Sequence, residues 1–313
     1  MLRALLRRLL LSIPLLFIVS ILTFVLTGLT PGDPAHTILG TNATPAAIAA
    51  INKTLGLDKP IWVQYWHWLT GLVHGDLGRS IFSSEPVTTI LANSLPITIT
   101  LIVGAVIVSV LVGIPIGVAS ARRSKSSGQL IDAFSLVGYA IPPFFLGLLL
   151  TLLFADTLGW LPPSGWVDPG EDFGGWLLSI VLPVLTLAIP GAAIVARQTR
   201  QGMLDTLGRD FIRSLRARGL SSRSIIYKHA LRNSLGNVVT LLGLYVVGML
   251  LGTTLVETVF AMQGLGSVAV VATNQHDLPV LEGAALYFTI VVIVAFAIVD
   301  VTRAALNPKL RTR

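Results

Sequence analysis

The side chains best suited to chemistry are sparse in this sequence, and they show none of the spacings of a catalytic or metal site. The chain has no cysteine, which excludes disulfides, thiolate metal sites and a cysteine nucleophile. It contains no H-E-x-x-H pair, no G-x-x-x-x-G-K-[ST] phosphate loop and no G-x-S-x-G elbow. Its histidines are scattered at His36, His67, His74, His229 and His276. These patterns predict that the chain is not an enzyme and holds no cofactor or metal.

The acidic residues suggest one further candidate site. Glu257 lies near the outer end of a predicted membrane span. The favoured interpretation is an interfacial carboxylate that reaches water, and the alternative places Glu257 on a substrate path with Pro142 and Phe144. Asp300 can pair with Arg303, three residues further along a helix. Because ionisable residues are nearly absent deep in the spans, proton relays and voltage sensors are disfavoured.

These residues must be positioned by membrane helices. Of the 313 residues, 53% are hydrophobic and 12% charged, and the mean hydropathy is +0.80, outside the usual range of soluble domains. A spanning helix needs about 20 mostly apolar residues. Six segments meet this requirement and predict an all-α polytopic membrane protein: 9–29, 96–119, 134–155, 176–196, 235–260 and 284–301. The first is predicted to be a retained helix and not a signal peptide, since it is too long for a typical signal core.

Basic residues predict the orientation of these spans, since Lys and Arg near span ends stay in the cytoplasm. The N-terminus carries 3, the loop 119–134 carries 3, the loop 197–232 carries 9 and the C-terminal end carries 4, which places 19 of the 22 on one side. The other side has only Lys53, Lys59 and Arg79. Both termini are therefore predicted to be cytoplasmic. Distribution of the charge among loops also disfavours nucleic-acid binding.

Two parts of the chain are distinguished on this basis. Residues 1–95 are predicted to hold the first span and a long external loop, and 96–313 a five-helix core whose cytoplasmic loop covers about 197–234. In the external loop, Tyr65, Trp68, Leu69 and Leu72 recur at helical spacing and predict an interfacial helix with indole rings at the headgroup level. Prolines and glycines within the spans indicate kinked, closely packed helices.

The cytoplasmic loop contains a second pattern, "DFIRSLRARGLSS" at 210–222. Asp210 is predicted to cap a helix that begins at Phe211, and Gly219 to end it in the left-handed conformation. Ser221 or Ser222 would then cap a second helix that continues into the fifth span. The hairpin could lie on lipid, act as a solvated linker, or dock into a groove on a cytoplasmic partner, and docking is slightly favoured. Its candidate docking residues are Asp210, Phe211, Ile212, Arg213, Leu215, Arg216, Arg218, Gly219 and Leu220.

The segment resembles the loop of dipeptide and oligopeptide permease subunits of ABC importers, of form D-Y-V-R-T-A-R-A-K-G-L-S followed by H-A-L-R-N. Here "HALRN" stands at 229–233. Other motifs of the first permease subunit type occur in the same order: "PGDP" at 31–34, "LGLDKPIWVQYWHWL" at 55–69, "GDLGRS" at 75–80, "IPPFFLG" at 141–147, "PVLTLAIPG" at 183–191, "ARQTRQGMLDTL" at 196–207, "ETVFAMQGLG" at 257–266 and "HDLPVLEG" at 276–283. Any one of these is weak, but together they cover nearly the whole chain.

The resemblance implies a type I ABC-importer permease fold in a prokaryotic cell membrane. It also implies four kinds of partner: a second, similar permease, two ATPase subunits that bind ATP, an external solute-binding protein, and a peptide. The segment 211–220 would be the coupling helix. Subunits of nickel and glutathione importers share the pattern, so these solutes remain alternatives. Met262-Gln263 and His276 depart from the family's usual Trp-Pro and Arg on the outer side. The rival from another class is a self-sufficient channel or ion-coupled carrier.

Overall fold

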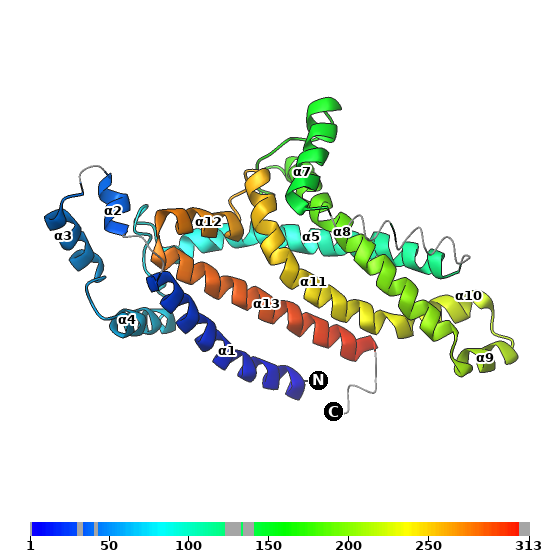
Figure 1. The fold of residues 1–313 in the computed structure, drawn as a ribbon. Coiled ribbons are helices and arrows are strands. Elements are labelled where there is room, and N and C mark those ends of the chain that lie inside the picture. Colours follow the sequence, from blue (N-terminus) through cyan, green and yellow to red (C-terminus); the bar gives the residue numbers. More distant parts are fainter. Residues whose placement is uncertain (1, 30–33, 41–42, 123–132, 134–140, 307–313) are drawn as a thin grey trace. The chain divides into compact units, whose positions relative to one another are not determined.

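A computed structural model describes residues 2–29, 34–40, 43–122, 133 and 141–306 (Figure 1). Within these ranges every named element is a helix, and the single extended pairing is an isolated bridge between Arg79 and Pro86. The elements, in chain order, are α1 (Leu2–Leu29), α2 (Pro34–Leu39), α3 (Pro45–Leu55), α4 (Ile61–Val73), α5 (Val87–Ala121), α7 (Pro143–Thr151), η2 (Leu152–Thr157), α8 (Phe173–Leu207), α9 (Asp210–Ala217), α10 (Ser222–Ser224), η3 (Ile225–Ala230), α11 (Leu231–Val259), α12 (Leu265–Gln275) and α13 (Leu278–Leu306).

Five helical stretches among the described residues are long and apolar enough to cross a membrane: Leu10–Leu29, Val87–Ala121, Phe173–Leu207, Ser222–Val259 and Leu278–Leu306. Each contains most or all of one predicted span, and four of them extend beyond the apolar run because their ends pack against other parts of the chain. The predicted span 134–155 lies partly outside the described residues. Its described part is the shorter apolar helix Pro143–Thr157. The all-α prediction is confirmed.

The chain divides into two compact units. The first contains Ile99–Met262 and the part of α13 from Val294 onward. The second contains the chain from Leu6 to Thr98, together with Gln263–Ile293.

Close helix contacts in the first unit depend on glycine. A Cβ atom built on Gly113 would lie 2.7 Å from the carbonyl oxygen of Ala192, and one on Gly117 would lie 2.5 Å from that of Ala196. Real Cβ atoms essentially never approach this closely, so α5 can pack on α8 only because both positions lack a side chain. The expectation that small residues bring the spans together is confirmed here.

A three-helix contact surrounds Pro190 inside α8. Proline at this position removes the N–H that would donate to the Thr186 carbonyl one turn earlier, and the two carbonyls that follow Thr186 accept side-chain hydrogen bonds. The Tyr245 hydroxyl of α11 donates to the Leu187 carbonyl at 2.8 Å, and the Ser109 hydroxyl of α5 donates to the Ala188 carbonyl at 3.1 Å. Gly191 faces both of these side chains, and a Cβ there would meet the Ser109 hydroxyl and the Tyr245 ring. Side chains of α5 and α11 therefore stabilise the proline-containing part of α8.

Tyr245→Phe is expected to lower the free energy of unfolding by about 1 kcal/mol, because it removes one donor from a carbonyl that water does not reach. Thermal denaturation of the purified chain in detergent measures this change. Tyr227→Phe is the matched control, since Tyr227 is half exposed, and it is expected to change little. Equal melting temperatures for both variants would contradict a stabilising role for the Tyr245 bond.

The second unit has a core of its own beneath α4. Its buried members are Leu77, Val87, Leu91, Leu265, Ala272, Val280 and Ala284, with Trp68 and Leu72 packed against them. Tyr65 and Trp68 also contact Phe24 of α1, with ring centroids 5.4 and 6.4 Å apart. The predicted helix is confirmed, but its Tyr65–Trp68 face packs within the protein because α1 and the core cover it. On α4, the exposed indoles are those of Trp62 and Trp66.

Candidate functional site

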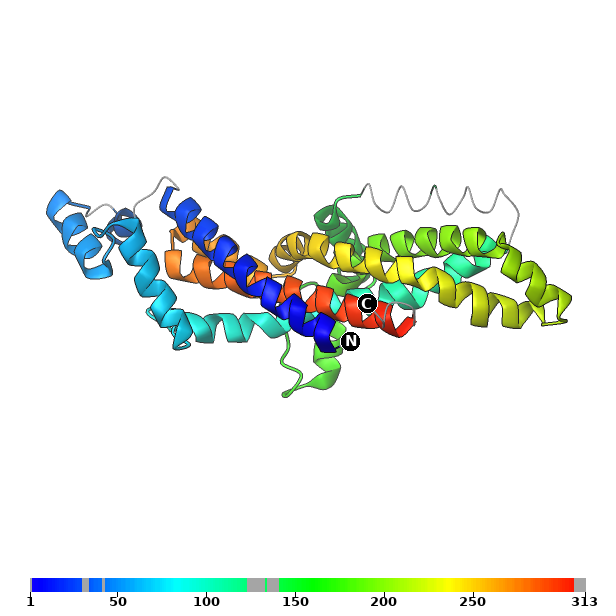
Figure 2. The ribbon, with the colours of Figure 1, turned by 90° about the horizontal axis from the view of Figure 1, so that it is seen from below.

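The candidate site is the hairpin formed by α9, Gly219 and α10, which joins α8 to α11 within the first unit (Figures 1 and 2). Helix α9 begins at Asp210, and its N-cap is Arg209, which has an extended backbone and no side-chain cap bond. The prediction that Asp210 is the cap is therefore wrong by one residue. As the first residue of the helix, Asp210 still places a negative charge at the positive end of the helix dipole.

The end of α9 follows a Schellman motif. Gly219 has a φ of +77°, as predicted for a left-handed stop. Its N–H donates to the Arg216 carbonyl at 2.9 Å, and the Leu220 N–H donates to the Leu215 carbonyl at 3.2 Å. These are the two backbone bonds that define the motif, and they satisfy carbonyls that the helix end leaves without partners. The stop is thus set by both backbone conformation and hydrogen bonding.

Side chains on α9 divide into an anchoring group and an exposed group. Ile212 is completely buried, whereas Phe211 is 38% exposed. Leu215 and Leu220 are partly buried, and Arg213, Arg216 and Arg218 are exposed. The predicted apolar face of Phe211, Ile212 and Leu215 is therefore divided: Ile212 attaches α9 to the protein, and Phe211 remains available to another surface.

The arginines of α9 keep most of their charge free for a partner. Arg213 forms an ion pair with Asp210 at 3.7 Å, but the two side chains are 82% and 96% exposed. Such a pair contributes little to stability, since water and salt screen it. The helix therefore presents a basic surface beside an exposed aromatic ring.

The hairpin continues directly into a membrane-spanning helix. The Ser221 hydroxyl accepts a hydrogen bond from the Ser224 N–H at 3.3 Å, which confirms Ser221 as a cap. One π-helical turn, η3, follows before α11. Helix α9 contacts η3, and Ile225 on η3 is 3% exposed. Helix α9 is therefore linked to α11 through the packed residues of η3.

The base of the hairpin is also packed against α5 and α8. A buried cluster brings together Val118 of α5, Met203 of α8 and Ala230 of η3, and Ala121 completes it. Gly202 of α8 lies so close to Ser234 of α11 that an added Cβ would come within 2.8 Å of the serine Cβ. Three long helices thus meet at the base of the hairpin. The sequence showed the small residues but not which helices they join.

The structure does not group the predicted substrate-path residues on one surface. Pro142 is the exposed N-cap of α7, and Phe144 is 43% exposed. Glu257 on α11 is completely buried, so the interpretation of an interfacial carboxylate that reaches water is wrong. Phe260 and Met262, just after α11, are buried too, and the Met262 N–H donates to the Glu257 backbone carbonyl at 2.8 Å.

Comparison with known proteins defines the family. Residues 113–312 match the family described as the inner membrane component of binding-protein-dependent transport systems, and residues 1–102 match the family of its N-terminal part. A Brucella abortus protein named as a peptide transport system permease protein is 39% identical over 308 residues, or 98% of each chain. A Salmonella typhimurium protein named as a glutathione transport system permease protein is 39% identical over 312 residues, or 99% of each chain.

The fold also resembles that of a solved transporter. An inward-facing structure of the MetNI methionine ABC transporter matches with a TM-score of 0.55 and 18% identity, over 72% of this chain and 99% of that one. The likeness supports the ABC-importer permease fold. Together with the family matches over nearly the whole sequence, it agrees with the motifs found between residues 31 and 283. The chain therefore belongs to the family of binding-protein-dependent transport system inner membrane components, and is a multi-pass transporter subunit, not an enzyme.

Proposed function

We propose that this chain is the permease subunit of an ATP-driven peptide importer, in which it forms half of the translocation pathway. Peptide is the first choice of solute because the Brucella abortus relative carries that name and because the ordered motifs resemble those of dipeptide and oligopeptide permeases. ATP belongs to the partner ATPases. A second, similar permease completes the pathway as a heterodimer, and an external binding protein delivers the solute.

The observation that carries the coupling proposal is the division of α9 into a buried anchor and an exposed basic and aromatic surface. Ile212 and the Schellman stop at Gly219 hold the helix rigidly on η3. Phe211 and the exposed arginines then insert into a groove on an ATPase subunit. Since η3 continues into α11, closure of the ATPases moves a membrane helix. The residues of the proposed coupling surface are Asp210, Phe211, Ile212, Arg213, Leu215, Arg216, Arg218, Gly219 and Leu220.

Phe211→Ala is expected to weaken binding of the ATPase subunits by about tenfold, since exposed aromatic anchors contribute most of the energy at such contacts. Co-purification with the partner ATPase subunits measures it, and uptake of a labelled dipeptide should fall in parallel. Ser214→Ala, an exposed change on the same helix, serves as the control. If the Phe211→Ala variant and the Arg213→Glu variant both bound the ATPase subunits as well as wild type does, the coupling role would be contradicted.

Glutathione is the second candidate solute, because the Salmonella typhimurium relative is equally similar and carries that name. Uptake competition distinguishes the two. Excess unlabelled glutathione should leave dipeptide uptake unchanged if the transporter is a peptide importer, and should abolish it if glutathione is the preferred solute.

The assembly itself can be tested against the rival class. A self-sufficient channel or ion-coupled carrier would transport solute in liposomes that contain this chain alone. The proposed importer requires both permeases, the ATPases, the binding protein and ATP for uptake.

A further inference from the structure

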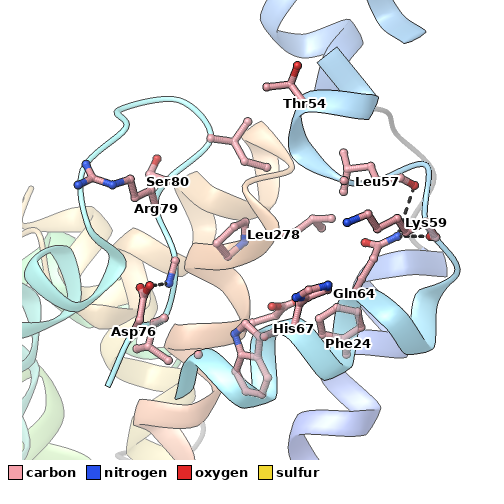
Figure 3. Close-up of a pocket in the computed structure, with 18 of the residues that line it drawn as sticks. Phe24, Thr54, Leu57, Lys59, Gln64, His67, Asp76, Arg79, Ser80 and Leu278 are labelled. Atoms are coloured by element: carbon pink, nitrogen blue, oxygen red, sulfur yellow. Dashed lines mark hydrogen bonds between the residues drawn. The ribbon is translucent and has the colours of Figure 1, made fainter. Parts of the chain in front are cut away.

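A cavity of about 650 Å³ lies within the second unit, bordered by α3, α4, the segment 76–84 and the start of α13 (Figure 3). We call it the charged cavity. Its wall is held by specific bonds. The Gln64 side-chain amide donates to the Leu57 and Lys59 carbonyls at 3.3 and 2.7 Å. The buried Asp277 carboxylate accepts hydrogen bonds from the Ser80 hydroxyl and the Ile81 N–H. The volume is typical of small-ligand sites.

Positive charge gathers at this cavity. Lys53, Lys59 and Arg79, the three Lys and Arg residues predicted to be external, all line it. Arg79 is already engaged, since its guanidinium donates to the Ser84 carbonyl at 2.8 Å. The Lys59 side chain instead extends toward Leu278 of α13 (Figure 3). Lys59 is therefore placed to hold the anionic part of a ligand.

The acidic residues of the lining are Asp76 and Glu282, and Glu282 of α13 is the buried one. It is 7% exposed, and among the described residues its carboxylate has no hydrogen-bond or ion-pair partner. The Trp68 Nε1 donor, in the same wall, is likewise buried without an acceptor among the residues described. A buried carboxylate is normally paired, because removing it from water is costly. Two unpaired polar groups beside one cavity indicate a polar ligand.

The described residues favour an ammonium group over a metal ion as the partner of Glu282. No group of three or more His, Cys, Asp or Glu residues close enough to hold a metal occurs among the described residues. A ligand with an ammonium and a nearby anion fits the lining better, since the lining includes the buried Glu282 carboxylate and the ammonium groups of Lys53 and Lys59. The Asp76 carboxylate, also in the lining, already accepts a hydrogen bond from the Gly78 N–H. Both peptides and ethanolamine headgroups have this chemistry, and the cavity volume exceeds what a single ammonium would fill.

We propose that the charged cavity binds a small peptide in its zwitterionic form. The peptide ammonium pairs with the Glu282 carboxylate, and the terminal carboxylate pairs with Lys59. The assignment of a peptide rests on the proposed function. The proposed site lies on the predicted external side of this permease and is formed by one chain. Through it, the permease itself would distinguish peptides with free termini from peptides with blocked termini.

The test is equilibrium binding of radiolabelled Ala-Ala to the assembled transporter without its binding protein, in phosphatidylcholine nanodiscs, whose lipid has no primary ammonium. Wild type should bind, and N-acetyl-Ala-Ala should bind at least about tenfold more weakly, because the charge-assisted bond to Glu282 is lost. Glu282→Gln should weaken Ala-Ala binding by a similar factor without lowering the melting temperature. Lys59→Gln should also weaken binding, and Lys59→Arg should restore most of it.

Glu85→Gln is the matched control, an exposed carboxylate on the neighbouring segment, and should bind like wild type. Equal affinity of the wild-type protein for Ala-Ala and N-acetyl-Ala-Ala overturns the proposal. This comparison requires no variant. Binding of labelled glycerophosphoethanolamine that excess Ala-Ala does not displace overturns it in favour of a lipid headgroup. Loss of binding-protein docking in Glu282→Gln, with no Ala-Ala binding in wild type, overturns it in favour of a protein contact.

Failure of this site and failure of the proposed function give different results. If dipeptide uptake requires the ATPases but Ala-Ala does not bind the complex, the importer assignment stands and the cavity assignment falls. If Ala-Ala binds in a Glu282-dependent way but no peptide is imported, the cavity assignment stands and the importer assignment falls.

Discussion

Replacing Gly219 with proline is expected to abolish solute uptake while leaving the chain in the membrane. Gly219 has a φ of +77° and donates its N–H to the Arg216 carbonyl. Proline fixes φ near −65° and has no N–H, so it removes both conditions of the Schellman stop. Helix α9 then loses its defined end, and its exposed surface can no longer dock into the proposed ATPase groove. Uptake of labelled dipeptide by the reconstituted transporter measures the effect.

Two further substitutions at Gly219 distinguish the effect of backbone strain from that of steric contact by a side chain. A Cβ atom there would meet nothing within 4 Å, so only backbone strain opposes a side chain. Gly219→Asn should retain most uptake, since asparagine tolerates the left-handed region. Gly219→Val should destabilise the left-handed backbone conformation by about 1–2 kcal/mol. Its uptake should therefore lie between those of the proline and asparagine variants. Normal uptake by the proline variant would overturn the rigid-hairpin mechanism.

Gly117→Val is expected to have the largest effect on folding. Its Cβ would lie 2.5 Å from the Ala196 carbonyl oxygen and 2.6 Å from the Thr199 Cβ on α8. A backbone carbonyl inside a helix cannot move aside, so α5 and α8 must separate. Overpacking of this kind costs about 1–3 kcal/mol and occasionally more. The amount of monodisperse chain recovered in detergent, and its melting temperature, should both fall sharply.

Gly248→Val provides the control, because it makes the same substitution in a long helix where an added Cβ meets nothing within 4 Å. It should leave the yield of the isolated chain close to that of wild type. If the two variants gave equal yields, the close α5–α8 contact could not be what Gly117 provides.

The local sequence pattern was sufficient to predict those structural features that are determined within one helix or turn. Apolar runs of membrane-spanning length predicted the long helices, and Gly219 and Ser221 predicted the stop and the cap of the hairpin. These features depend on hydropathy and on backbone conformation, which neighbouring residues determine. The cap at Asp210 was wrong by one position because Arg209 adopts the extended cap conformation without a side-chain bond.

Burial could not be predicted in the same way, because it depends on segments far apart in the chain. Glu257 was expected to reach water, but it is completely buried in the folded chain. Tyr65 and Trp68 were expected to lie at the membrane interface, but α1 and the core of the second unit cover them. Neither outcome follows from the spacing of residues along one helix.

By itself, the sequence determined the class of protein: its hydropathy and charge distribution require a membrane bundle, and its ordered motifs identify the permease family. Only the tertiary structure decided which side chains are anchored and which are free. It buried Ile212 while exposing Phe211 on the same helix, and it left Glu282 unpaired beside a cavity lined by Lys59. The physical reason is that hydropathy is a property of each segment, whereas burial and pairing are properties of the segments that meet.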